Sequence, residues 1–271
     1  MNCLILNRLQ VRNANAQPVW WMIGPPGPTA YCGFGHALAR HLNILDCYLG
    51  IGPVHHDYEL LADFNSPHQY RSATFIDHND HLGKSKNKYG ALSGQPTARC
   101  NLTISLILAF DKKPKINPVD LNKFLSRARV AGGTFIDLPR ITQCQYEEIK
   151  LRGFGLHPRL DLMTDDPMDL LSLCHPSKRH KKAAASTNTS VTTEDGDANN
   201  SWLMPTTYGY RAITPVVENP YSRDQYPHTF VEPMVGPIQY RPVSADTPPP
   251  LWTHTNTEDL YLTNTIQTQD L

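Results

Sequence analysis

The sequence predicts an α+β protein built on an antiparallel βαββαβ unit. Three observations lead to this prediction. A segment near the middle of the chain alternates apolar and polar residues, two amphipathic helical segments lie on either side of it, and further strand-like segments complete the order. The 271 residues suffice for one large domain or for a domain with a sizeable insertion.

The first strand is predicted at 4–11 and the first helix at 29–42. A Gly/Pro turn at 24–28 separates them, as is typical of the start of a helix. The helix would bury one apolar face, made by Ala30, Phe34, Ala37, Leu38 and Leu42. A second strand is predicted at 51–61, despite its polar centre.

The third strand and the second helix carry the clearest local signals. Apolar residues at every second position from 100 to 110 predict a half-buried strand. Asn117 and Pro118 are an N-cap and a first-turn proline, and the predicted helix ends at Gly132. Its buried stripe would consist of Leu121, Phe124, Leu125 and Ala128. A fourth strand is predicted at 134–141.

This order of elements is that of a ferredoxin-like (RRM-like) unit. Residues 1–150 would form it, with a polar insertion at 62–98 that is too long for a hairpin turn and so indicates function or disorder. A helical segment and a flexible linker are predicted at 151–200, with the helix around 167–173 and the linker at 177–200. Strands and loops at 201–271 would form an irregular extension that packs back on the first unit.

Charge is balanced overall but unevenly distributed. Lysine plus arginine equals aspartate plus glutamate at 25 each, yet 71–152 holds 14 basic and 7 acidic residues. This surplus indicates a surface that faces a polyanion, whereas scattered solvated charges are the alternative. Six cysteines without a CxxC pair indicate free thiols and a reducing compartment. Without a long apolar run, we expect a cytoplasmic protein that does not enter a membrane.

Five segments resemble one known family in the order that the family has them. They are RLQVRNANA, GFGHALARHL, RCNLTISLIL, ARVAGGTF and WLMPTTYGYRAITPV. The resemblance is to the Cas-five-type subunit of type I-F CRISPR Cascade, also called the Csy complex.

The resemblance implies a role in antiviral defence without catalysis. The subunit would bind the 5′ repeat-derived handle of the crRNA, contact the backbone subunit and a large subunit, and help the complex recognise target double-stranded DNA. The family layout also implies that the 62–98 insertion is a thumb. We expect no cofactor and no metal.

Candidate RNA-binding residues lie at the end of the first strand. Asn13 and Asn15 offer amides to base edges or phosphates, or alternatively brace the loop through hydrogen bonds to its backbone. Arg12 has the planar fork that suits a phosphate or a stacked base. Trp20 could stack on an unpaired base, although one of two adjacent tryptophans is expected in the core.

Two further segments are candidates for nucleic-acid contacts. In the first, Arg127 and Arg129 precede Gly132 and Gly133, which would let the backbone approach RNA closely, as in the family's glycine-rich loop. A helix C-cap would explain one of the glycines. In the second, three lysines alternate along the insertion and could follow phosphates of RNA or target DNA, unless they lie in a solvated loop: Lys84, Lys86 and Lys88.

Two other functions are compatible with the sequence. A repeat-processing endoribonuclease of the same superfamily would need a general base and a cation, which His36 or His81 could supply with Lys84. A scaffold protein with an acidic recruiting half is the more distant alternative. The histidine spacing does not favour a metal site, since His36 and His41 lie five positions apart on a helix.

Overall fold

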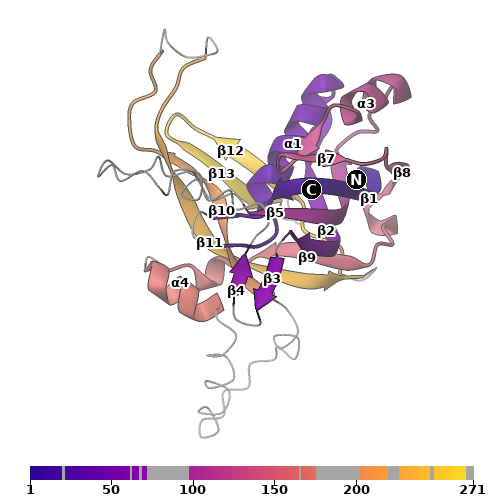
Figure 1. Ribbon diagram of the computed structural model, residues 1–271. Coiled ribbons are helices and arrows are strands. Elements are labelled where there is room, and N and C mark those ends of the chain that lie inside the picture. The colour runs from indigo at the N-terminus through magenta and orange to yellow at the C-terminus, as the bar shows by residue number, and fades with distance from the viewer. Residues whose placement is uncertain are drawn as a thin grey trace, which may run out of the picture.

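The computed structural model describes residues 1–19, 22–61, 63–66, 69–71, 98–164, 166–174, 202–218, 226–244 and 247–266. Most of its strands belong to one 11-stranded antiparallel sheet, and few helices accompany them (Figure 1). The predicted α+β class is therefore confirmed.

Four strands lie side by side in the order β2–β5–β1–β7. They are β2 (Tyr48–Leu60), β5 (Arg99–Phe110), β1 (Asn2–Asn15) and β7 (Gly133–Phe135). The three longer strands were predicted within a few residues of their bounds. Burial alternates along the first half of β5, whereas the consecutive residues 106–110 are all buried, because both faces of the sheet are covered there.

Two helices cover one face of these four strands. They are α1 (Pro28–His41) and α3 (Pro118–Leu125), whose apolar sides share a core with the inward residues of β1 and β5. The predicted N-cap is confirmed, because the Asn117 side chain accepts a hydrogen bond from the Val119 backbone N–H at 3.0 Å. A smaller cluster that includes Ile5, Ile107 and Tyr146 covers part of the opposite face.

The predicted end of the second helix and the predicted fourth strand are wrong. The helix stops at Leu125, and β6 (Arg129–Val130) pairs with β7 in a tight hairpin. Strand β7 then ends at Phe135, and β8 (Arg140–Gln145) pairs with the first half of β1. Pro139 lies between them and has no N–H to donate to a strand ladder.

The C-terminal half adds strands to the same sheet. These are β9 (Gly153–Pro158), β10 (Trp202–Ala212), β11 (Val231–Val243), β12 (Trp252–Asn256) and β13 (Leu260–Thr265). Because Trp252 of β12 pairs with Ile51 of β2, the strands β2, β9, β11, β10, β13 and β12 form a closed ring. In Figure 1 the yellow and orange strands of this ring lie beside α1.

The remaining elements are short. The predicted helix around 167–173 is confirmed as α4 (Pro167–Cys174), and a small hairpin pairs β3 (Asp63–Ser66) with β4 (Gln69–Arg71). Three 3-10 turns lie at Leu45–Cys47, Tyr146–Glu148 and Leu160–Leu162. The rest of the predicted thumb and the predicted linker at 177–200 lie outside the described residues.

Helix α1 is fixed between the first four strands and the C-terminal ring. The Tyr31 hydroxyl lies 2.9 Å from Nε2 of His55 on β2, and both residues are buried. On the ring side, the Cys32 thiol donates to the carbonyl of Thr253 on β12 at 3.6 Å. Contacts on two sides therefore fix the position of α1. The exposed side of this helix forms part of a groove.

We expect the protein to lose stability in acid because of His55. Burial lowers the pKa of this histidine from 6.5 to about 3, so it stays neutral in the folded chain while the unfolded chain takes up a proton near pH 6.5. The unfolded state then binds more protons, and the free energy of unfolding falls between pH 6.5 and 3, by about 1.4 kcal/mol per pKa unit at most.

Urea unfolding at several pH values measures this effect. His55→Gln should make the free energy of unfolding less dependent on pH than it is in the wild type. Equal slopes for His55→Gln and the wild type would contradict the expectation.

Candidate nucleic-acid interface

A groove of about 840 Å³ lies where the end of β1, the start of α1 and the β6–β7 turn meet. We call it the N-terminal groove. It is lined by Asn15, Gln17, Pro18, Pro26, Gly27, Thr29, Ala30, Arg99, Ala131, Gly132, Thr207, Tyr210 and Tyr261. Two of the residues predicted to bind RNA, Asn15 and Gly132, are therefore brought together.

The end of β1 is irregular, and this shapes one wall of the groove. A bulge between Val11 and Ala14 leaves Asn13 with a positive φ of 59°. Arg99, the partner of Asn15 across the strands, donates from Nη1 to the Asn13 carbonyl at 3.4 Å. The Asn15 side chain accepts from the Gln17 N–H at 3.2 Å and donates to the Gln17 carbonyl at 3.3 Å. The Asn15 amide thus braces the loop, the alternative considered from the sequence.

The start of α1 forms one wall of the groove, where the Ala30 N–H donates to the Gly27 carbonyl at 3.2 Å. Its N-cap is Gly27, which has no side chain to accept a hydrogen bond from the first turn, and Pro28 follows. The lining residues Thr29 and Ala30 belong to this turn. Helix N-termini carry a partial positive charge, so they attract anions.

Local backbone geometry and packing explain why the two positions after the second helix are glycines. Ala131 and Gly132 have positive φ of 49° and 76° and form the two-residue turn between β6 and β7. Gly133 packs against β1, where an added Cβ would lie 2.8 Å from the Arg12 carbonyl oxygen and 2.9 Å from Cα of Ala14. Only Gly132 of this pair lines the groove.

The predicted arginines lie away from the N-terminal groove. Arg12 and Arg129 both pair with Thr134, so the three side chains share one face of the sheet. All three are exposed, on the face opposite the helices. Arg127 is exposed after α3. Their predicted RNA contacts stay predictions, as do those of Trp20, Lys84, Lys86 and Lys88, which lie outside the described residues.

Most lining residues were missed from the sequence, and three of them are the charged and aromatic side chains of the groove. Arg99 stands at the start of β5, and Tyr210 and Tyr261 come from the distant strands β10 and β13. The two tyrosine rings lie 6.4 Å apart at 35°, and Tyr210 is 38% exposed. No local pattern marks them, because they meet only when the ring of C-terminal strands is formed.

The electrostatic character of the groove favours an anionic ligand. Arg99 is the charged residue among those that line the groove, and none of the lining residues is acidic. Burial and the nearby Cys32 raise the pKa of Tyr261 to about 12, so its hydroxyl stays neutral. Across the described ranges, no three His, Cys, Asp or Glu side chains are grouped so that they could hold a metal ion.

Comparison with known proteins gives the family. The family model described as CRISPR-associated protein (Cas_Csy2) matches residues 4–262, almost the whole chain. The chain belongs to the Csy2 family. It is also 26% identical over 287 residues to the CRISPR-associated protein Csy2 of Pseudomonas aeruginosa (strain UCBPP-PA14), across 86% of this chain and 84% of that protein. Membership in the Csy2 family makes the chain a subunit of type I-F Cascade in CRISPR defence. No helix in the described part of the chain is long and apolar enough to cross a membrane.

Proposed function

We propose that this Csy2-family subunit is of the Cas-five type and binds the 5′ repeat-derived handle of the crRNA, without catalysing a reaction. The observation that carries the proposal is the N-terminal groove. It combines the start of α1, Arg99 and two tyrosine rings in one cavity whose lining includes no carboxylate.

The arrangement of the first half supports this proposal. Strands β2–β5–β1–β7 with α1 and α3 on one face have the order of a ferredoxin-like unit, the fold expected of an RNA-binding subunit of this kind. We infer that residues 1–150 are such a unit, and that its groove rather than its open sheet face holds the handle.

The chemistry of the groove suits single-stranded RNA. The helix start and Arg99 can bind phosphates, and the rings of Tyr210 and Tyr261 can stack on unpaired bases. Base stacking tolerates any sequence, whereas backbone donors and an amide such as Gln17 can select base edges.

The endoribonuclease alternative receives less support. His36, one of the two general bases considered, has its ring edge to face against that of His254, with centroids 5.0 Å apart. The other histidine considered, His81, and its partner Lys84 lie outside the described residues. We further propose that the subunit contacts the backbone and large subunits and takes part in recognising target double-stranded DNA within the complex.

Arg99→Ala tests the proposal directly. We expect weaker binding of RNA transcribed from the repeat of the same locus, because one phosphate contact is lost. The log–log slope of affinity against salt should decrease by about 0.7. Arg140→Ala, an exposed arginine on β8, is the matched control.

Fluorescence anisotropy titrations of the full chain at several salt concentrations supply the measurement. If Arg99→Ala and Arg140→Ala bind the handle RNA with wild-type affinity and slope, the N-terminal groove is not the RNA site. A discrete cleavage product would instead support the nuclease.

A further inference from the structure

A second groove continues along the exposed side of α1, on the other side of Tyr261. We call it the histidine groove. It has a volume of about 680 Å³ and is lined by Gly33, His36, Ala37, Arg40, His41, Phe124, His254 and Tyr261. The α1 residues recur at intervals of three and four, so they form one stripe that continues the stripe of Thr29 and Ala30 in the N-terminal groove.

We propose that the histidine groove is a second nucleotide-binding site, into which the RNA strand continues from the N-terminal groove. Arg40 would bind a phosphate, and the ring stack of His254 and Tyr261 would support a base. This inference rests on the proposed function and extends it, because it gives the strand a path of about 20 Å along α1.

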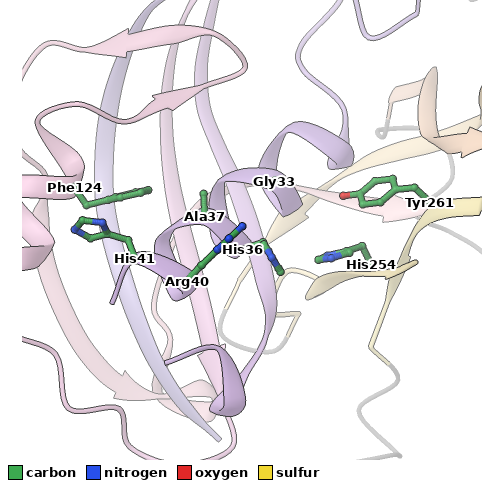
Figure 2. Close-up of a pocket in the computed structure, with 8 residues that line it drawn as sticks. All are labelled: Gly33, His36, Ala37, Arg40, His41, Phe124, His254 and Tyr261. Carbon is green, nitrogen blue, oxygen red and sulfur yellow. The ribbon is translucent and has the colours of Figure 1, made fainter. Parts of the chain in front are cut away.

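A row of aromatic rings connects the two grooves. Tyr210 and Tyr261 lie 6.4 Å apart, and Tyr261 and His254 are stacked at 5.2 Å and 28°. His254 then meets His36 edge to face at 5.0 Å. Figure 2 shows His36 and His254 turned toward each other, with Tyr261 beyond His254. The row starts in one groove and ends in the other, as a surface for successive bases would.

The charge of the groove matches a phosphate backbone. Arg40 supplies positive charge, and no lining residue is acidic. Burial and the nearby His36 lower the pKa of His254, so this histidine contributes its ring rather than a charge. Basic side chains in the last turn of a helix also stabilise the helix dipole, which is a sufficient reason for Arg40 and His41. The helix dipole does not explain why the groove also contains His254, which belongs to β12, and His36, which lies in the middle of the helix.

The observations favour RNA over an acidic peptide as the occupant. The Arg40 cation alone would suit either ligand. The aromatic row and the shared wall at Tyr261 make the histidine groove continuous with a cavity that suits unpaired bases. An acidic segment of a partner subunit would need no such row of rings.

Gly33 offers a sharp test because it lies in the groove and has no atom within 4 Å of an added Cβ. Gly33→Glu would place a carboxylate among the proposed phosphate contacts, and Gly33→Gln is the neutral control of the same shape. Both substitutions raise helix propensity, so neither is expected to lower the melting temperature. We expect Gly33→Glu to bind the full handle RNA at least about fivefold more weakly than Gly33→Gln.

The double variant His36→Gln with Arg40→Ala tests the histidine groove by removing two of its side chains instead of adding a carboxylate. Anisotropy titrations with the full handle RNA should show weaker binding and a salt slope lower by about 0.7 for each lost phosphate contact. Handle RNAs would also be shortened stepwise from each end. We expect the wild type and the double variant to bind one of these shortened RNAs with equal affinity, because that RNA fills only the N-terminal groove.

The outcomes separate this inference from the proposed function. If Arg99→Ala weakens binding but Gly33→Glu binds like Gly33→Gln, the histidine groove is not an RNA site while the proposed function stands. If the wild type binds no handle RNA, both fail. If the groove variants bind RNA normally but no longer assemble with the other Cascade subunits, the groove holds a protein segment and the inference is wrong.

Discussion

Trp252→Ala is expected to lower the free energy of unfolding by about 3–5 kcal/mol. The Trp252 side chain is fully buried, donates from Nε1 to the Leu156 carbonyl at 3.0 Å, and packs against Tyr208 with ring centroids 5.7 Å apart. Its backbone pairs with Ile51, the contact that closes the ring of strands. The substitution therefore leaves a large cavity at the junction of β12 and β2.

Equilibrium urea unfolding measures the loss, and Trp252→Phe separates volume from hydrogen bonding. The phenylalanine variant should be less destabilised because most of the buried ring is kept. His254 lies two residues further along β12, so Trp252→Ala should also weaken RNA binding at temperatures where the chain remains folded. Wild-type stability of Trp252→Ala would contradict the burial of this side chain at the junction of β12 and β2.

Tyr261→Ala is expected to give the largest loss of handle RNA binding among single substitutions, about 1–3 kcal/mol. Tyr261 is the residue that lines both grooves, and its ring contacts those of Tyr210 and His254. Removing it would interrupt the aromatic row at its centre. Tyr261→Phe keeps the ring and should bind RNA nearly as well as the wild type.

The control for this experiment is Tyr226→Ala. Tyr226 is 69% exposed and lines neither groove. Melting temperatures of all three variants should accompany the anisotropy titrations. Equal RNA affinities for Tyr261→Ala and Tyr226→Ala would remove the aromatic row from the RNA site.

Local sequence signals were sufficient for the elements that the core stabilises. The alternation at 100–110 and the Asn117–Pro118 cap each depend on residues close in the chain, and both are present in the structure. The stretch after Leu125 was mistaken for helix because its Arg and Ala residues favour helix. Two residues with positive φ, Ala131 and Gly132, instead turn the chain into the β6–β7 hairpin.

The candidate site could be predicted only in part. Asn15 and Gly132 were found because the ends of neighbouring strands meet at one edge of a sheet. Arg99, Tyr210 and Tyr261 reach the groove through pairings between segments far apart in the chain. Of these pairings, the one between β10 and β13 belongs to the closed ring of strands, which no local pattern in the sequence indicated.

The most direct test of RNA binding by this subunit is ultraviolet cross-linking of the assembled Cascade complex. The guide RNA would be labelled in its 5′ handle, and the cross-linked peptides would be identified by mass spectrometry. We expect handle nucleotides to cross-link to peptides that contain Tyr210 and Tyr261. Handle cross-links confined to other subunits, or to the open sheet face around Arg12 and Arg129, would contradict the assignment of the RNA site to the grooves along α1.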